Sequence, residues 1–172
     1  TGRQVTDAGL AMLHEFPMFK TLRGDVETGS GDDDYPTHLL IDGPFTNQGL
    51  ARLAGLDGVV ELDMFWNVTG ITSEGFEVLT RLSNLASLGC DGKLSDDSAM
   101  VHIATIPRLR KLRAQGTVGT DKGFVALSRS RTLERFWGRE CPNLTGEGFV
   151  ALSKMPALRT LAPQHDSRLG LV

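Results

Sequence analysis

One spacing of hydrophobic residues, h-x-x-h-x-x-h-x-x-h, recurs six times along the chain. The six ladders are Leu13/Phe16/Phe19/Leu22, Leu53/Leu56/Val59/Leu62, Leu79/Leu82/Leu85/Leu88, Ile103/Ile106/Leu109/Leu112, Leu127/Ser130/Leu133/Phe136 and Leu152/Met155/Leu158/Leu161. From the start of one ladder to the start of the next there are 40, 26, 24, 24 and 25 residues. Four regular periods and one enlarged one predict a stack of similar units, each with one strand and one helix or 3₁₀ turn.

Within one unit the periodicity changes from that of a helix to that of a strand. In residues 72–90, Phe76 and Leu79 are three apart, as on one face of a helix, whereas Leu88 and Cys90 are two apart, as on one face of a strand. Such a unit has an apolar inner surface that only a stacked neighbour can cover. The pattern predicts an α/β leucine-rich-repeat solenoid, a horseshoe arc with parallel strands on the concave face and short helices on the convex face.

We expect a single domain over residues 1–172, with about six repeats. The predicted repeats span about 5–23, 45–64, 71–90, 94–114, 119–138 and 144–162. The enlarged period contains an inserted loop at about 24–38, after which residues 38–42 read as a further strand, so we expect five to seven strands. Residues 163–172 lack another ladder and form either a cap over the last repeat or a tail.

A polar phrase of the form TDAGL precedes five of the six ladders and places a glycine on the first helical turn. These glycines are Gly9, Gly49, Gly75, Gly123 and Gly148. Because glycine costs a helix about 1 kcal/mol relative to alanine, we expect the missing Cβ to permit close approach of a neighbouring repeat. The fourth repeat departs from the phrase, with Ala99 in place of the glycine.

The phrases TDAGLAML at 6–13 and RECPNLTGEGFVALSKMPALRTL at 139–161 resemble a known repeat subclass. They are similar to the cysteine-containing leucine-rich repeats of F-box substrate receptors and to the GALA-type repeats of bacterial effectors. The resemblance covers residues 5–162, and the subclass's cysteine after the strand is matched at Cys141. It implies a repeat fold and a binding role. The chain carries no F-box, so the resemblance does not imply a ubiquitin-ligase activity for it.

Composition narrows the classes of partner and compartment. The net charge is −3 over 172 residues and the pI is about 5.8, which disfavours a general nucleic-acid binder. The sequence has no apolar run of membrane-spanning length and no recognisable secretory signal, although it begins at Thr1 and could be trimmed. Cys90 and Cys141 fall two strands apart, about 10 Å, too far for a disulfide. We therefore expect a cytoplasmic protein, with a monomer favoured.

The sequence offers no pattern that predicts catalysis, a cofactor or a bound metal. Its histidines lack metal-ligand spacing, no serine or cysteine has a recognisable base partner, and no phosphate-binding loop is present. Asp32, Asp33 and Asp34 form a run that reads either as a solvated loop or as a cation site. Since a calcium loop also requires ligands at alternating offsets and a closing glutamate, the solvated loop is favoured.

Residues between the ladder positions should line the other face of the strands. They form three columns: Glu61, Ser87, Lys111, Arg135, Thr160; then Asp63, Gly89, Arg113, Trp137, Ala162; then Phe65, Asp91, Gln115, Arg139, Gln164. The columns change from acidic to basic along the stack, with a tryptophan in the basic half. As candidate partner-binding residues we select Lys111, Arg113, Arg135, Trp137, Arg139, Glu61, Asp63 and Phe65, with Phe65 rather than Trp66 exposed.

These observations predict a non-catalytic module that binds a protein through the concave strand face. The alternative for the columns is an ordinary solvated strand face, on which charged residues are expected. At the level of function, the chain could instead be the substrate-targeting or regulatory domain of a larger enzyme or effector. It could also be a purely structural repeat that spaces other domains.

Overall fold

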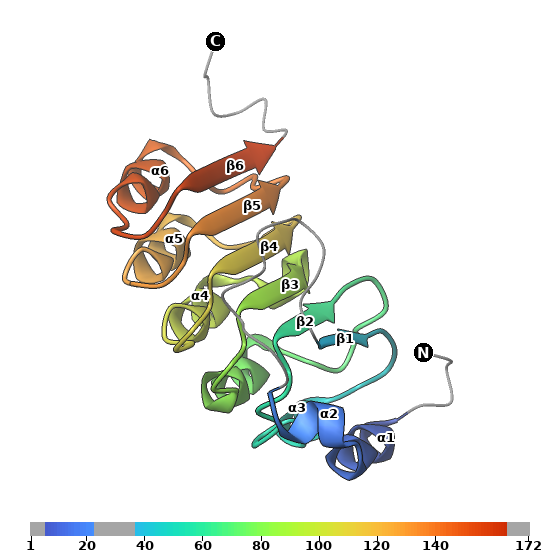
Figure 1. Ribbon diagram of the computed structural model, residues 1–172. Coiled ribbons are helices and arrows are strands. Elements are labelled where there is room, and N and C mark those ends of the chain that lie inside the picture. Colours follow the sequence, from blue (N-terminus) through green and yellow to red (C-terminus); the bar gives the residue numbers. More distant parts are fainter. Residues whose placement is uncertain (1–5, 23–36, 165–172) are drawn as a thin grey trace.

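The computed structural model describes residues 6–22 and 37–164, which form an α/β fold around one parallel sheet. Its six strands lie in chain order and all run in the same direction (Figure 1). They are β1 (His38–Ile41), β2 (Glu61–Met64), β3 (Ser87–Asp91), β4 (Lys111–Gln115), β5 (Arg135–Arg139) and β6 (Thr160–Gln164). The predicted α/β class is confirmed, and the strand number lies within the expected five to seven.

Helices precede β1 and connect the later strands, and they form a row beside the sheet (Figure 1). They are α1 (Asp7–Ala11), η1 (Met12–Glu15), α2 (Pro17–Lys20), α3 (Asn47–Ala51), η3 (Ser73–Arg81), η4 (Gly92–Leu94), α4 (Asp97–Ile103), α5 (Asp121–Leu127) and α6 (Gly146–Ser153). Neighbouring helices of the row pack against one another, from α1 on α3 to α5 on α6. In the described part of the chain, no helix has both the length and the apolar character needed to cross a membrane.

The ladders of the second to fifth repeats form the core between the helices and the sheet. Leu53, Leu82 and Leu88, for example, are completely buried, and even the polar rung Ser130 is 2% exposed. The first ladder differs, because Phe16 is 50% exposed and Leu13 and Phe19 are only partly buried. Residues 6–22 form helices and no strand, so the strand of this first unit is β1, after the inserted segment.

A repeated hydrogen-bonded contact links four pairs of neighbouring helices. In each pair, the residue that follows one helix's N-cap accepts from the backbone N–H of the N-cap threonine of the next helix, at 2.6 to 2.9 Å. The pairs are Asp7 with Thr46, Asn47 with Thr72, Asp97 with Thr120, and Asp121 with Thr145. The side chains of each pair form a second hydrogen bond through the threonine hydroxyl. We call these contacts the inter-helix bridges.

The inter-helix bridges explain the glycines of the repeated phrase. A Cβ at Gly49, Gly75, Gly123 or Gly148 would lie 2.0 to 2.6 Å from the bridging oxygen of the preceding repeat. The predicted close approach is therefore confirmed at these four positions. Ala99 occupies the glycine position of the fourth repeat, and there the preceding repeat has Ser73, a shorter side chain, at the bridging position.

Two bridging carboxylates are held ionised by their hydrogen bonds. Burial opposes ionisation of Asp97, but hydrogen bonds from the Thr120 N–H, the Thr120 hydroxyl and the Gly123 N–H outweigh it and lower the pKa of Asp97. Asp121 behaves in the same way: burial is opposed by hydrogen bonds from Thr145 and Gly148, and its pKa is lowered. These two bridges thus depend on charge-assisted hydrogen bonds, which protonation in acid would weaken.

Candidate functional site

The face of the sheet turned away from the core carries the residues that lie between the ladder positions. We call it the polar face. The strand pairing places them in the columns that the alternation predicts, since Glu61 pairs with Ser87, Ser87 with Lys111, Lys111 with Arg135 and Arg135 with Thr160. The second column, from Asp63 through Gly89, Arg113 and Trp137 to Ala162, is paired in the same way. Side chains far apart in sequence are thereby brought into rows.

Arg113 of β4 reaches across the polar face to the two acidic residues of β2. Its Nη2 donates to Glu61 Oε1 at 2.7 Å and to Asp63 Oδ1 and Oδ2 at 2.7 and 2.9 Å. His38 of β1 donates to Asp63 Oδ2 at 3.0 Å, and the Ser87 hydroxyl donates to Glu61 Oε1 at 3.2 Å. The side chain of Asp63 is only 8% exposed, so its charge requires these partners. We call these five residues the Arg113 cluster.

The Arg113 cluster exists because its column has a glycine in the middle. Gly89 separates Asp63 from Arg113, and a Cβ there would lie 2.1 Å from Asp63 Oδ1 and 2.6 Å from the Phe65 ring. Because position 89 of β3 has no side chain, the Arg113 side chain can cross β3 and reach the carboxylates on β2. The signal for this contact in the sequence is the glycine that stands between Asp63 and Arg113 in one column.

A hollow of about 480 Å³ lies in the polar face beside the Arg113 cluster. Its lining comprises Glu61, Ser87, Lys111, Leu112, Arg113, Arg135, Phe136, Trp137 and Thr160. Among these described lining residues, three side chains are cationic and one, Glu61, is a carboxylate that already accepts a hydrogen bond from Arg113. Along β5, Arg135 and Arg139 are exposed and Trp137 is half-buried between them. The hollow brings together five of the residues predicted from sequence: Glu61, Lys111, Arg113, Arg135 and Trp137.

The other predicted residues lie in different settings. Asp63 is buried within the Arg113 cluster, and Arg139, 4.0 Å from Glu140, lies beyond the lining of the hollow at the end of β5. The prediction for the aromatic pair is wrong: Trp66 is 68% exposed, whereas Phe65 is half-buried. The cause is that β2 ends at Met64 and Trp66 has φ +64°, so strand alternation no longer applies. The Phe65 ring instead packs near Gly89 and contacts Trp66, with ring centroids 5.6 Å apart.

Three residues of the polar face carry side chains of the kind that bind metal ions. The ligand atoms of His38, Glu61 and Asp63 lie within 4.8 Å of one another, a set that could hold a divalent cation if Arg113 moved aside. In the structure, the Arg113 guanidinium supplies the positive charge between the carboxylates.

Cys90, on the opposite side of β3, is completely buried, and burial together with Asp91 and Asp63 raises its pKa to about 12. Its thiol therefore stays protonated at neutral pH and is a poor nucleophile.

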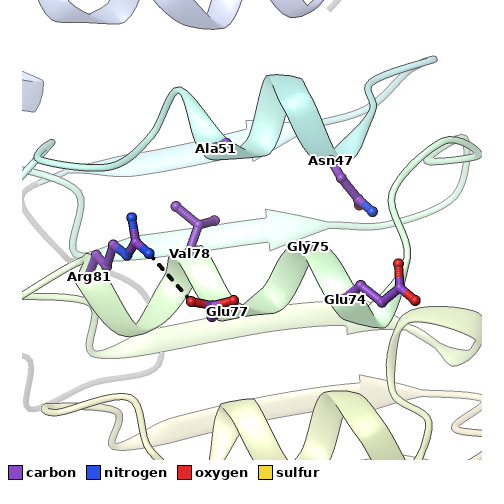
Figure 2. Close-up of a pocket in the computed structure, with 7 residues that line it drawn as sticks. All are labelled: Asn47, Ala51, Glu74, Gly75, Glu77, Val78 and Arg81. Atoms are coloured by element: carbon purple, nitrogen blue, oxygen red, sulfur yellow. Dashed lines mark hydrogen bonds and ion pairs between the residues drawn. The ribbon is translucent and has the colours of Figure 1, made fainter.

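A smaller groove of about 250 Å³ lies on the helix side, between α3 and η3. Figure 2 shows Arg81 and Glu77 pointing toward one another there, with Nη2 and Oε1 3.4 Å apart. Both side chains are about two-thirds exposed, and such a pair contributes little binding or stability. Asn47, at the other end of the groove, is engaged in an inter-helix bridge. The hollow on the polar face is larger and has more cationic and aromatic lining, so we take it as the candidate site.

Other predictions fall outside the described residues or concern the cysteines. The Asp32 to Asp34 run and most of the inserted loop lie outside the described ranges, as do residues 165–172 of the expected cap or tail. Cys90 and Cys141 are both buried. No protein-family model matches the chain, and a search of curated proteins gave no significant match.

Proposed function

We propose that the chain is a leucine-rich-repeat solenoid, similar to the cysteine-containing and GALA-type subclass, and acts as a non-catalytic protein-interaction module. Support for the repeat assignment comes from the recurring ladder and from the phrase whose threonine, aspartate and glycine meet in the inter-helix bridges. The six parallel strands in chain order are compatible with it. Solenoids use the surface formed by successive strands to bind extended partners.

The observation that carries the proposal is the hollow on the polar face. It is lined by Trp137, Arg135 and Lys111 and is large enough for a side chain of a partner to enter. Tryptophan and arginine are the residue types most enriched among interface residues that dominate binding energy. No packing role visible in the described residues requires a tryptophan on this face, whereas the apolar rungs on the other face build the core.

The test is capture of a partner by the intact chain and by a double variant, Trp137→Ala with Arg135→Ala. We expect the double variant to lose capture by more than about tenfold, because truncating two central interface residues costs several kcal/mol. Its melting temperature should fall by no more than about 4 °C, because Arg135 is exposed and the half-buried Trp137 loses only part of its packing.

The matched control removes an arginine and an apolar residue from the helix side, Arg81→Ala with Val101→Ala. Both side chains are at least half exposed there, and we expect capture to be unchanged. Normal capture by the Trp137 and Arg135 variant would reject the polar face as the binding surface. If neither protein nor variant captured any partner, a structural spacer would be the better description.

A further inference from the structure

We propose that the Arg113 cluster is a binding site for one divalent transition-metal ion of the zinc class. His38, Glu61 and Asp63 supply the ligands, and the ion takes the place of the Arg113 guanidinium between the two carboxylates. Such a site goes beyond the protein-binding role proposed above and does not depend on it. Four observations support it: the donor atoms, their spacing, the charge of the cluster and the position of the guanidinium.

The strand pairing brings three metal-binding side chains together. His38 of β1 is in register with Glu61 of β2, and Asp63 lies two residues further along β2, on the same face. The ligand atoms of the three residues all lie within 4.8 Å of one another. A donor set of one imidazole nitrogen and two carboxylate oxygens suits zinc and its neighbours in the first transition row, whereas calcium and magnesium prefer oxygen ligands alone.

The spacing of the ligand atoms is close to that of a tetrahedral metal centre. Zinc binds nitrogen and oxygen at about 2.0–2.2 Å, so neighbouring ligand atoms of a tetrahedral centre are about 3.3–3.6 Å apart. His38 Nε2 and Asp63 Oδ2 are 3.0 Å apart, and the widest pair in the set is no more than 4.8 Å apart. Side-chain movements of about 1–1.5 Å therefore complete a site with three protein ligands and a water molecule. His38 binds the metal through Nε2 as its Nδ1–H tautomer.

The charge of the cluster favours a divalent ion over a guanidinium. The side chains of Glu61 and Asp63 are only 15% and 8% exposed, so both carboxylates lie largely out of water. Among the described residues, Arg113 is the only arginine or lysine in contact with either of them. With His38 neutral, one guanidinium leaves an excess of negative charge between the two carboxylates. A divalent ion balances both.

The Arg113 guanidinium occupies the position that the metal requires. Its Nη2 lies 2.7 Å from Glu61 Oε1 and 2.7 and 2.9 Å from the two oxygens of Asp63, so an ion bound to the same oxygens would overlap it. The arginine side chain is 39% exposed and can turn toward solvent when the ion binds. Metal and guanidinium are therefore alternatives, and removal of the arginine side chain must strengthen metal binding.

The test is a calorimetric titration of the intact chain with zinc chloride, at neutral pH in a buffer that does not bind metals. We expect one zinc ion per chain. His38→Ala should weaken binding by about tenfold or more, since even the loss of a residue that only supports a ligand costs ten- to a hundredfold. Arg113→Ala should strengthen binding by about tenfold, because a charge-assisted contact no longer competes. His102→Ala, on α4 at the helix side, is the matched control and should leave the affinity unchanged.

A second measurement does not require Arg113→Ala to remain folded. Cobalt(II) accepts the same ligands as zinc and absorbs visible light strongly when it is four-coordinate. We expect this absorption with the native chain, its loss when one equivalent of zinc is added, and its absence in His38→Ala. The His38 side chain is 46% exposed, so its truncation should leave the fold intact, which the melting temperature of the variant checks.

Three results would overturn the proposal. Zinc binding to Arg113→Ala but not to the native chain would mean that the guanidinium holds its position against the metal. An unchanged zinc affinity in His38→Ala would place the ion elsewhere on the chain. Equal zinc affinities of the native chain and a folded Arg113→Ala variant would show that the ion does not take the position of the guanidinium.

Discussion

The two sides of this molecule differ in how strictly their residues repeat. On the helix side, a threonine, an aspartate or asparagine and a glycine recur at the same place, because together they form the inter-helix bridges. On the polar face, the corresponding column changes from Asp63 to Gly89 to Arg113 to Trp137 over successive strands. Residues that repeat have a role in stacking, whereas residues that do not are available for other roles.

The Arg113 cluster shows that this distinction is not absolute. Arg113 lies on the variable side, yet it forms ion pairs with two carboxylates, one of which is buried. Ala99 and Ser73, in turn, are exceptions on the repeating side, and they depart from the pattern together. The helix side and the polar face are therefore best compared by the contacts that each residue makes. These contacts separate a residue that is held by the fold from one that faces solvent.

The largest effect should follow from filling a glycine of an inter-helix bridge. In Gly123→Ala the new Cβ would lie 2.6 Å from Asp97 Oδ1 and 3.0 Å from the Asp97 Cα, so the two repeats must move apart. We expect a loss of about 2–3 kcal/mol in the free energy of unfolding, typical of overpacking at a close contact. Urea denaturation at neutral pH measures it.

The double variant Gly123→Ala with Asp97→Ser copies the pair that Ala99 and Ser73 form in the native chain. It should recover about 1 kcal/mol or more relative to Gly123→Ala alone, which is a coupling of the size found between residues in contact. Additive losses in the double variant would show that the glycine and the bridging residue are independent. The explanation of the repeated phrase would then be wrong.

Much of the fold was predictable because the apolar residues of the ladders recur at a regular spacing along the sequence. The ladder spacing predicts the units, strand alternation predicts the columns, and Gly49 or Gly123 indicates close contact. The residues that bridge to the next helix were not predicted. The joint departure of Ser73 and Ala99 from the repeated phrase is the signal in the sequence that indicates this contact. The sequence does not decide which segment forms the strand of the first unit, because an insertion separates β1 from the first ladder. No local signal in the sequence predicts that Trp66 adopts a positive φ and points outward.

The candidate site was predictable as a set of columns but not as a set of contacts. Sequence alternation places Arg113 beside Trp137, and the strand pairing agrees. What it cannot give is the direction of a long side chain, and Arg113 turns toward β2 to reach Glu61 and Asp63. The choice depends on the missing side chain at Gly89, which lets Asp63 lie over β3 within reach of Arg113, and this arrangement involves three strands at once.

A smaller effect on stability should separate two arginines of the polar face. Arg113→Ala leaves the buried Asp63 without its main cation, and we expect a loss of about 1–2 kcal/mol, reduced from the value for a fully buried pair because Arg113 is 39% exposed. Arg139→Ala, the matched control, should change the free energy of unfolding by less than about 0.5 kcal/mol, because Arg139 is half exposed and lies 4.0 Å from an exposed Glu140. Equal losses would mean that both arginines have a structural role, and the polar face would offer less for a partner.

The smallest effect concerns acid and the bridging carboxylates. The pKa values of Asp97 and Asp121 are lowered in the folded chain, so their contribution to stability is fully present above the unfolded carboxyl pKa of about 3.9 and is lost as the pH falls through the folded values. Asparagine already forms one bridge, at Asn47, without a titrating group. The double variant Asp97→Asn with Asp121→Asn should therefore lose less stability than the native chain between pH 5 and about pH 3.

Urea midpoints at the two pH values measure the difference, with Asp57→Asn, outside the bridges, as the control. An identical acid dependence in the bridge variant and the native chain would show that these hydrogen bonds persist with protonated carboxyls. The stacking of the helices would then depend on the shape of the glycine contact rather than on charge.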